Sequence, residues 1–341
     1  MVELWVRSFH RREPDLEIAM NSPQTSRDSG IATLLSGAPS NWNRWGARDE
    51  LGVLNEIGPA EVLRGIAAVR SGKTFTLGTA VGRPGGDPSW PGRVPAQRFS
   101  VVDRSDVLAG KGEDLSGGLE TAEDVLINAL HAGTHCDALG HAWYDGKLYN
   151  GVDAIGTTRA LEHASIEPIA AHGMVGRGVL IDLPRFMGKE HLDPSDTFTH
   201  EELIACATAQ GSEIQSRDFV LIRTGWLSAL TRMAPVAEAD FAEPGLRYTL
   251  ELARWFHDRD IAGLITDTIA NEATVDQASG VMLPLHGLLL RDLGVSLTEI
   301  AELDTLAEDC ASDGQYEFLY AAAPLRIVGA TAGPVNPIAI K

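Results

Sequence analysis

The stretch that decides the fold is His131-Ala-Gly-Thr-His135-Cys-Asp137-Ala-Leu-Gly-His141, which holds three of the chain's ten histidines within eleven residues. Imidazole nitrogens and a carboxylate are the ligands that borderline divalent cations such as Zn²⁺ and Mn²⁺ accept. The alternative interpretation is a surface loop of scattered polar side chains. The spacing and the flanking apolar runs favour a metal site over that loop.

The spacing also restricts the backbone that carries these ligands. On a helix, His131 and His135 would share a face, whereas Asp137 would lie about 240° further round the axis. On an extended strand the side chains project to one side, but four residues span about 13 Å, too far for two ligands of one cation. The chain must therefore bend, and Gly133 permits a bend. We expect a strand that begins near Val125, bends at Gly133 and carries its ligands round a metal.

Short apolar runs elsewhere predict the rest of a sheet, and capping signals predict the helices. We expect strands at residues 73–81, 122–130, 178–183, 219–223, 261–265, 318–320 and 325–328, and helices at residues 199–210, 248–258 and 284–293. Residues 82–94 are rich in Gly and Pro and predict an irregular loop, and Pro334 and Pro337 are expected to break the last part of the pattern. The interpretation is one α/β domain over residues 42–341, preceded by an N-terminal arm over residues 1–41 that is poorly ordered or wraps the surface.

Composition excludes several classes of partner. Asp and Glu number 47 against 28 Lys and Arg, so the net charge is −19, and a phosphate backbone or an anionic membrane would be repelled. No apolar run approaches the roughly 20 residues that a membrane span needs. Three cysteines are few and odd in number, which indicates a reducing cytoplasm; Cys136 has the parity of a residue that points into the core. These features favour a cytoplasmic protein that acts on a small molecule.

The histidine segment resembles the H-x-G-T-H-x-D-x-x-x-H signature of the cyclase-like metal hydrolases, a family that includes bacterial kynurenine formamidase and isatin hydrolase. Three other segments agree with it: RWGARDELGVLN at residues 44–55, LIRTGW at 221–226 and PLRIVGATAGPVNP at 324–337. The resemblance covers nearly the whole chain from Trp42. Two positions depart from the pattern: Leu139 stands where Pro is usual, and Ala332 stands where Gly is frequent.

The resemblance implies a swivelling β/β/α fold with a central mixed sheet or barrel-like core, and a centre of one or two Mn²⁺ or Zn²⁺ ions. It also implies hydrolysis of a small cyclic or N-acyl amide or ester, such as a lactam, formamide or lactone, by a homo-oligomer, a dimer or tetramer. By position in the motif, the resemblance makes His131, His135 and Asp137 metal ligands and His141 the general base. It adds His286, from a downstream helix, and Glu299, from the strand after it, as further ligands.

Three tryptophans are candidates for the wall of a substrate pocket, because an aromatic substrate needs flat apolar surfaces. They are Trp45, Trp143 and Trp226, and Trp143 ranks first because it lies two residues after His141. Tryptophans are more often core residues, which is the alternative for each of them.

Two other functions compete with hydrolysis. A metal-dependent lyase or isomerase could use the same ion and imidazole to enolise a carbonyl substrate. A binding protein could keep the metal without turnover, but His141 disfavours this alternative, because a purely structural site has no use for a base.

Overall fold

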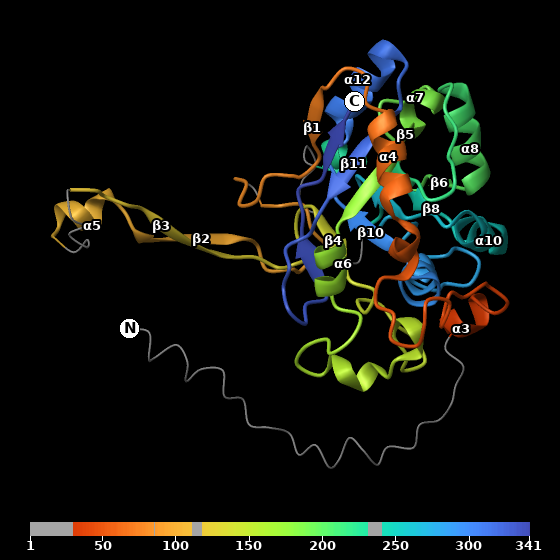
Figure 1. The fold of residues 1–341 in the computed structure, drawn as a ribbon, viewed down its shortest axis with the longest axis horizontal. Helices are drawn as coiled ribbons and strands as arrows, with labels where there is room; N and C mark the ends of the chain where they lie inside the picture. The colour runs from red at the N-terminus through yellow and green to blue at the C-terminus, as the bar shows by residue number, and fades with distance from the viewer. Residues whose placement is uncertain (1–29, 85, 111–117, 231–240) are drawn as a thin grey trace.

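The computed structural model describes residues 30–84, 86–110, 118–230 and 241–341, and its centre is a nine-stranded sheet (Figure 1). The order of the strands across the sheet is β1 (Thr74–Thr76), β13 (Ile338–Ile340), β11 (Glu317–Ala322), β5 (Met174–Asp182), β7 (Phe219–Arg223), β9 (Gly263–Thr266), β10 (Ser296–Glu299), β4 (His135–Asp137) and β12 (Ala332–Pro334).

The middle of the sheet is parallel and its flanks are antiparallel. Strands β5, β7, β9 and β10 run in one direction, and their almost continuous apolar sequences suit strands buried on both faces. Their carboxyl ends therefore meet at one edge, where ligand sites of open α/β sheets lie. Strand β4 runs antiparallel to β10 with His135 opposite Glu299. This register places a histidine of the motif beside a carboxylate more than 160 residues further along the chain.

Helices cover the sheet on its two faces (Figure 1). Their bounds are α3 Gly30–Leu34, α4 Pro59–Ala67, α6 Ile166–His172, α7 Leu183–Met187, α8 His200–Ala209, α9 Trp226–Leu230, α10 Leu250–Arg259, α11 Pro284–His286, which continues as a wider helical turn over Gly287–Leu293, and α12 Asp304–Asp313. Short 3₁₀ turns lie at Gly52–Glu56, Tyr149–Gly151 and Ala154–Thr157. Helix α4 packs closely on β5, since a Cβ at Gly65 would come within 2.6 Å of the Gly176 backbone.

A two-stranded arm projects away from this body (Figure 1). It consists of β2 (Gln97–Val102) and β3 (Glu123–Ile127), paired antiparallel, with α5 (Arg104–Leu108) near its tip. Nearly every residue of the two strands is exposed, apolar ones included. A second small sheet, β6 (Thr197–Phe198) with β8 (Gly245–Leu246), lies within the body.

The predicted swivelling β/β/α fold class, with a central mixed sheet and surrounding helices, is confirmed. The helices expected at 199–210, 248–258 and 284–293 and the strands at 178–183, 219–223, 261–265 and 318–320 are present with shifted ends. The Thr199 side chain and Glu202 form the expected capping box of α8.

Other parts of the secondary-structure prediction were wrong. A strand is present within the predicted residues 122–130, but it does not continue into the motif: β3 ends at Ile127, because it pairs with β2 in the separate, exposed arm. The strand expected at 73–81 shortens to β1, and the strand expected at 325–328 is absent: residues 325–327 are irregular and a turn follows at 328–329. Strands β12 and β13 were missed, since a Pro at the end of an edge strand, as at Pro334, leaves the pairing intact.

Residues 1–29 of the predicted N-terminal arm lie outside the described residues. The remainder of that segment packs on the body: Leu35 is buried, and Asn41 Nδ2 donates to the Leu293 carbonyl at 2.9 Å. Among the residues that the structure describes, no helix combines the length and apolarity that crossing a membrane requires.

Candidate metal centre

The histidine segment bends at Gly133, as its spacing predicts. Gly133 has a φ of +64°, a conformation that glycine adopts without strain. The following residue, Thr134, fixes the bend: its Oγ1 donates to the Ile300 carbonyl at 2.6 Å and accepts from the Thr79 amide at 2.7 Å. His135 and Asp137 then lie on β4 with the same side-chain parity, both fully buried. The local backbone thus holds the middle of the motif rigidly.

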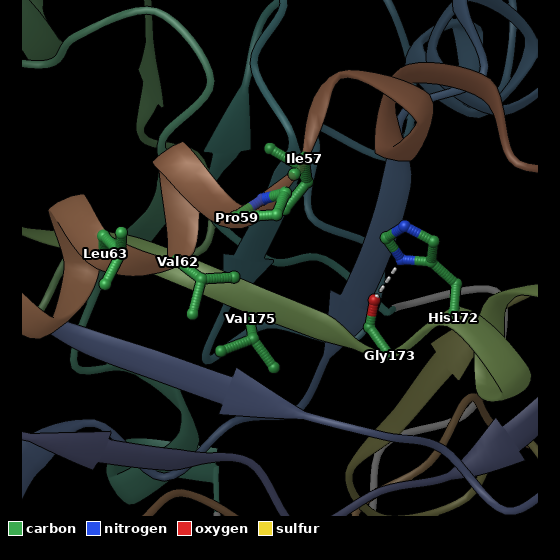
Figure 2. A pocket seen from close by; sticks show the side chains of 8 residues that line it. Ile57, Pro59, Val62, Leu63, His172, Gly173 and Val175 are labelled. Carbon is green, nitrogen blue, oxygen red and sulfur yellow. Dashed lines mark hydrogen bonds between the residues drawn. The ribbon is translucent and has the colours of Figure 1, made fainter.

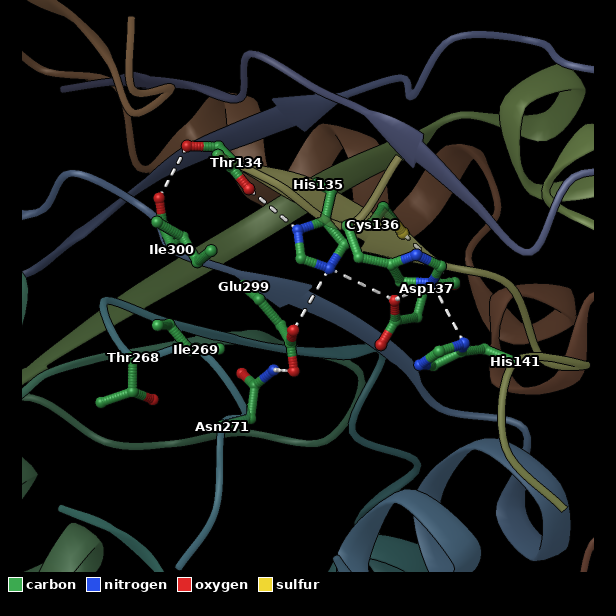
Figure 3. Close-up of polar contacts among 12 residues, drawn as sticks. Thr134, His135, Cys136, Asp137, His141, Thr268, Ile269, Asn271, Glu299 and Ile300 are labelled. Atoms are coloured by element: carbon green, nitrogen blue, oxygen red, sulfur yellow. Dashed lines mark hydrogen bonds and ion pairs between the residues drawn. The ribbon is translucent and has the colours of Figure 1, made fainter. Parts of the chain in front are cut away.

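Glu299 and His286 complete one group of side chains around Asp137 (Figure 3 shows the part on β4 and β10). His135 Nε2 lies 3.2 Å from Glu299 Oε2 and 3.5 Å from Asp137 Oδ1. His286 Nε2, from α11, lies 3.4 Å from Glu299 Oε1 and 3.8 Å from Asp137 Oδ2. The structure therefore brings together residues from three separate segments that the family resemblance had grouped.

His131 and His141 form a second group with Asp137. His131 Nε2 lies 3.7 Å from Asp137 Oδ1 and 3.0 Å from His141 Nδ1, and the two imidazole rings are 4.2 Å apart. Ligand atoms of His131, Asp137 and His141 lie within 4.8 Å of one another, as do those of His135, Asp137 and Glu299. Asp137 belongs to both groups, so the donor atoms offer places for one ion or for two.

The unpartnered atoms of this cluster fit a bound cation. Both oxygens of Asp137 and Nε2 of His135 are buried, and among the described residues none of these three atoms has a hydrogen-bond partner. Buried polar groups are nearly always paired, and an unpaired buried carboxylate is costly. Imidazole nitrogens and carboxylate oxygens are the donors that Mn²⁺ and Zn²⁺ accept. The residues present therefore suit a divalent cation.

Burial and charge set the protonation states around Asp137. Burial lowers the pKa of His131 to about 3, which leaves its imidazole neutral. Burial also acts to lower the pKa of His135, but the adjacent Asp137 and Glu299 carboxylates raise it to about 9. Burial opposes the charged form of Asp137, yet the surrounding histidines hold its pKa well below the ordinary value. A cation must displace the proton of His135 to bind there, so metal binding and protonation compete.

Two residues that the sequence interpretation missed orient the ligands, Asn271 and Glu272, in the loop after β9. Glu272 accepts from the Leu285 amide at 2.7 Å, from the His286 amide at 2.8 Å and from His286 Nδ1 at 2.7 Å. Because Nδ1 donates to Glu272, Nε2 is the atom of His286 that faces Asp137 and Glu299 and could hold a cation. Asn271 Nδ2 donates to Glu299 Oε1 at 3.1 Å (Figure 3). Their place directly after a buried parallel strand is the signal that could have found them.

The three candidate tryptophans lie in different surroundings. Trp45 donates from Nε1 to Glu56 at 2.9 Å, and the Arg44 guanidinium lies 4.5 Å from its ring centre. Trp143, two residues from His141, is 45% exposed. Trp226 is buried, and its Nε1 has no partner among the described residues. It belongs to an apolar cluster with Ile269, Ile300, Trp90 and Phe241. Because Ile300 follows Glu299 in the chain, Trp226 is the tryptophan whose contacts lead to the ligand group.

Cys136 lies between the ligands on β4 and points into the core, as predicted. It is fully buried, and burial raises the pKa of its thiol far above the ordinary value. A thiol held protonated in this way is neither a nucleophile nor a metal ligand.

An apolar groove lies elsewhere, between α4 and β5 (Figure 2). Its volume is about 550 Å³, and it is lined by Ile57, Pro59, Val62, Leu63 and Val175 together with residues 172–173. The one imidazole there, that of His172, lies 2.6 Å from the Gly173 carbonyl. The lining contains no predicted ligand, so this groove is separate from the metal centre.

Comparisons with known proteins agree with this fold. The Cyclase family model matches residues 76–273. A solved structure described as a novel cyclase is 35% identical, and the match covers 89% of this chain and 100% of that chain with a TM-score of 0.80. Isatin hydrolase A from Labrenzia aggregata is 22% identical over 82% of this chain and 97% of its own, with a TM-score of 0.55. Isatin hydrolase A from Ralstonia solanacearum is 22% identical over 78% of this chain and 91% of its own, also with a TM-score of 0.55. No curated protein matches the chain.

Proposed function

The chain belongs to the Cyclase family, and from that premise we propose that it is a metal-dependent hydrolase that cleaves a small cyclic or N-acyl amide or ester. The observation that carries the proposal is the gathering of four histidines and Glu299 around the two unpartnered oxygens of Asp137. Such a set has the donors for a divalent ion and an imidazole to spare for proton transfer.

In this proposal His131, His135, Asp137, His286 and Glu299 hold a Mn²⁺ or Zn²⁺ ion. When bound, such an ion lowers the pKa of water to about 7 and polarises a carbonyl oxygen. The protein's own contribution is rigid positioning: β4 and β10 hold His135 and Glu299 in register, and Glu272 fixes the tautomer of His286.

His141 is the proposed general base. It lies beyond Gly140, at the rim of the His131 group, and Nδ1 approaches His131 Nε2 at 3.0 Å. Burial lowers the pKa of His141 below its ordinary value, which leaves the imidazole neutral, so His141 would be able to take the proton of the attacking water. The same distance makes a ligand role for His141 the competing outcome of the tests below.

The proposed substrate is a small aromatic lactam or an aryl formamide. Two arguments support this class: the isatin hydrolases that share the fold act, by their name, on a small aromatic cyclic amide, and Trp226 lies in an aromatic cluster next to the Glu299 strand. Trp143 is the proposed outer wall and Trp45 the third candidate.

The test is a panel of aryl formamides, isatin-like lactams and lactones, with the chelated protein reloaded separately with Mn²⁺ and Zn²⁺. Reaction in ¹⁸O-labelled water distinguishes hydrolysis from the lyase or isomerase alternative, because only hydrolysis places the label in the product carboxylate. Product carboxylate without label would refute the hydrolase. If no member of the panel were turned over with either metal, the result would favour the alternative of a binding protein that keeps the metal without catalysis.

We further propose that the protein is a homodimer held together by the β2–β3 arm. Phe99, Val101, Val125, Leu126 and Ile127 are all exposed on this arm, and a lone two-stranded hairpin is only marginally stable in water. Both strands of the arm are also free edges, which a second copy can pair with about a two-fold axis. Light scattering at micromolar protein should give twice the chain mass; a monomer mass would refute the dimer.

A cytoplasmic location is also part of the proposal. Cys136, Cys206 and Cys310 are all buried and unpaired, as expected for a protein of a reducing compartment. The chain's excess of carboxylates supports a small-molecule substrate and argues against nucleic acid as a partner.

A further inference from the structure

Glu243 is a buried carboxyl that the mechanism so far does not use. It lies two residues before β8 and is 3% exposed. Its Oε2 accepts from the Ile269 amide at 2.7 Å, and the Ala270 amide also donates to the carboxyl. Its Oε1 is buried and has no partner among the described residues. One oxygen is thus fixed by the backbone, and no described residue offers a partner to the other.

The loop after β9 ties Glu243 to the metal centre. Ile269 and Asn271 of that loop lie beside Glu299 (Figure 3), and Asn271 is bonded to the Glu299 carboxylate. The segment that follows Glu243 is pressed against the same loop, since a Cβ at Gly245 would come within 2.0 Å of the Glu272 backbone. The charges of Glu299 and His286 accordingly act on Glu243.

Aromatic side chains cluster around the residues that precede Glu243 in the chain. Phe241, two residues before Glu243, lies 5.0 Å from the ring of Trp90 and 5.8 Å from the ring of Trp226. Ile269, whose amide holds Glu243, is a member of the same apolar cluster. The loop that holds Glu243 thus contributes Ile269 to the aromatic cluster and Asn271 to the contacts of Glu299.

Such surroundings keep the carboxyl protonated. Burial raises the pKa of Glu243 well above its ordinary value, and the Glu299 charge acts in the same direction. With the Ile269 amide donating to Oε2, the proton belongs on Oε1, the atom without a partner among the described residues. The hydroxyl of such a protonated carboxyl can donate a hydrogen bond or a proton to a bound molecule.

We propose that Glu243 is the general acid of the hydrolysis, and that its Oε1 hydroxyl donates a proton to the leaving nitrogen of an amide substrate. This rests on the proposed function and adds to it that the natural substrate has a poor leaving group. Water adds to the acyl carbon and gives one proton to the base. The bond between carbon and nitrogen then breaks, its electron pair stays on nitrogen, and Glu243 protonates that nitrogen. The proton held by the base returns through solvent to Glu243, so that acid and base are both restored.

The experiment compares two probes of nearly the same shape, formanilide and 4-nitrophenyl formate. Aniline must be protonated to leave, whereas 4-nitrophenolate leaves as an anion. Glu243→Gln keeps an oxygen for the Ile269 and Ala270 amides but has no acidic proton. We expect kcat for formanilide to fall about 10²- to 10⁴-fold, with kcat for the ester nearly unchanged.

Asp267→Asn is the matched control. Asp267 is a buried carboxyl of the same loop whose oxygens accept from the Thr224 amide at 2.8 Å, the Thr224 hydroxyl at 2.7 Å and the Gly225 amide at 2.7 Å. A purely structural carboxyl should change both probes by one common factor when it is replaced. An equal loss on both probes for Glu243→Gln, or no loss on either, would overturn the proposal.

Infrared difference spectroscopy gives a readout that does not depend on turnover. The spectrum of wild type minus Glu243→Gln should contain the C=O stretching band of a protonated carboxyl at neutral pH, with the metal content of the two proteins equal. A carboxylate band in its place would overturn the proposal. If the wild type hydrolyses neither probe, the proposed function fails on these substrates, and the spectrum still decides whether Glu243 carries a proton.

Discussion

Glu272→Gln is predicted to weaken metal binding without removing a metal ligand. Three buried donors converge on Glu272: the Leu285 amide, the His286 amide and His286 Nδ1. Glutamine can keep its oxygen toward His286, but its NH₂ group then faces the Leu285 amide, which loses its acceptor. His286 also loses the charge-assisted bond that fixes its tautomer.

The magnitude follows from these contacts. One buried donor without a partner costs about 1–3 kcal/mol, which for a chain of this size lowers Tm by about 2–6 °C. Loss of the outer partner of a ligating histidine typically reduces metal affinity about 10- to 100-fold. We therefore expect a modestly less stable protein whose Kd for Mn²⁺ or Zn²⁺ is raised about 10- to 100-fold.

The assay is calorimetric titration of chelated protein with each metal, accompanied by thermal melts of the metal-free form. Asp267→Asn again serves as the control, because Asp267 also accepts three buried donors but none of them belongs to a metal ligand. It should lose comparable stability and keep the wild-type Kd. Wild-type affinity in Glu272→Gln, or an equal loss in both variants, would refute the assigned role of Glu272.

Three further outcomes are expected. His141→Ala should keep metal and fold while kcat falls about 10²- to 10⁴-fold, whereas His135→Ala should lose the metal; a His141→Ala protein that purifies without metal would make His141 a ligand. Leu126→Glu places a charge on a side chain that is 54% exposed on the arm, and it should shift the protein toward monomer in light scattering without lowering the Tm of the body. Gly52→Ala should destabilise by about 2–5 kcal/mol in urea unfolding, because φ is +59° and a Cβ would meet the Gly294 carbonyl at 2.0 Å. Gly37→Ala, also at positive φ but in open space, should cost only the backbone strain.

The part of the site that is local in sequence could be predicted from the sequence. The spacing of His131, His135 and Asp137 requires a bend, and a glycine at the right place supplies it. His286 and Glu299 needed the family resemblance, because nothing local distinguishes them from surface residues. What brings Glu299 to His135 is an antiparallel register between strands far apart in the chain.

The local sequence pattern could not predict the roles of Glu272 and Glu243 or the exposed β2–β3 arm. Glu272 and Glu243 act through bonds to the backbone of other segments, and a lone Glu in a sequence resembles any solvated carboxylate. The apolar run at residues 125–127 was expected to belong to a strand that continues into the motif, yet it lies on an exposed hairpin. Burial by a second copy, as proposed above, would reconcile that sequence with its place in the fold.

The most direct test of the central claim is anomalous X-ray diffraction from crystals grown with Mn²⁺. The account predicts an anomalous peak within coordination distance of Asp137 and His135, with His286 and Glu299 in the same coordination sphere. A second peak between His131 and His141 would show that the two groups around Asp137 each take an ion, and would make His141 a ligand. Two results together would contradict the account: no anomalous peak at Asp137 in these crystals, and full activity of the protein without any divalent metal.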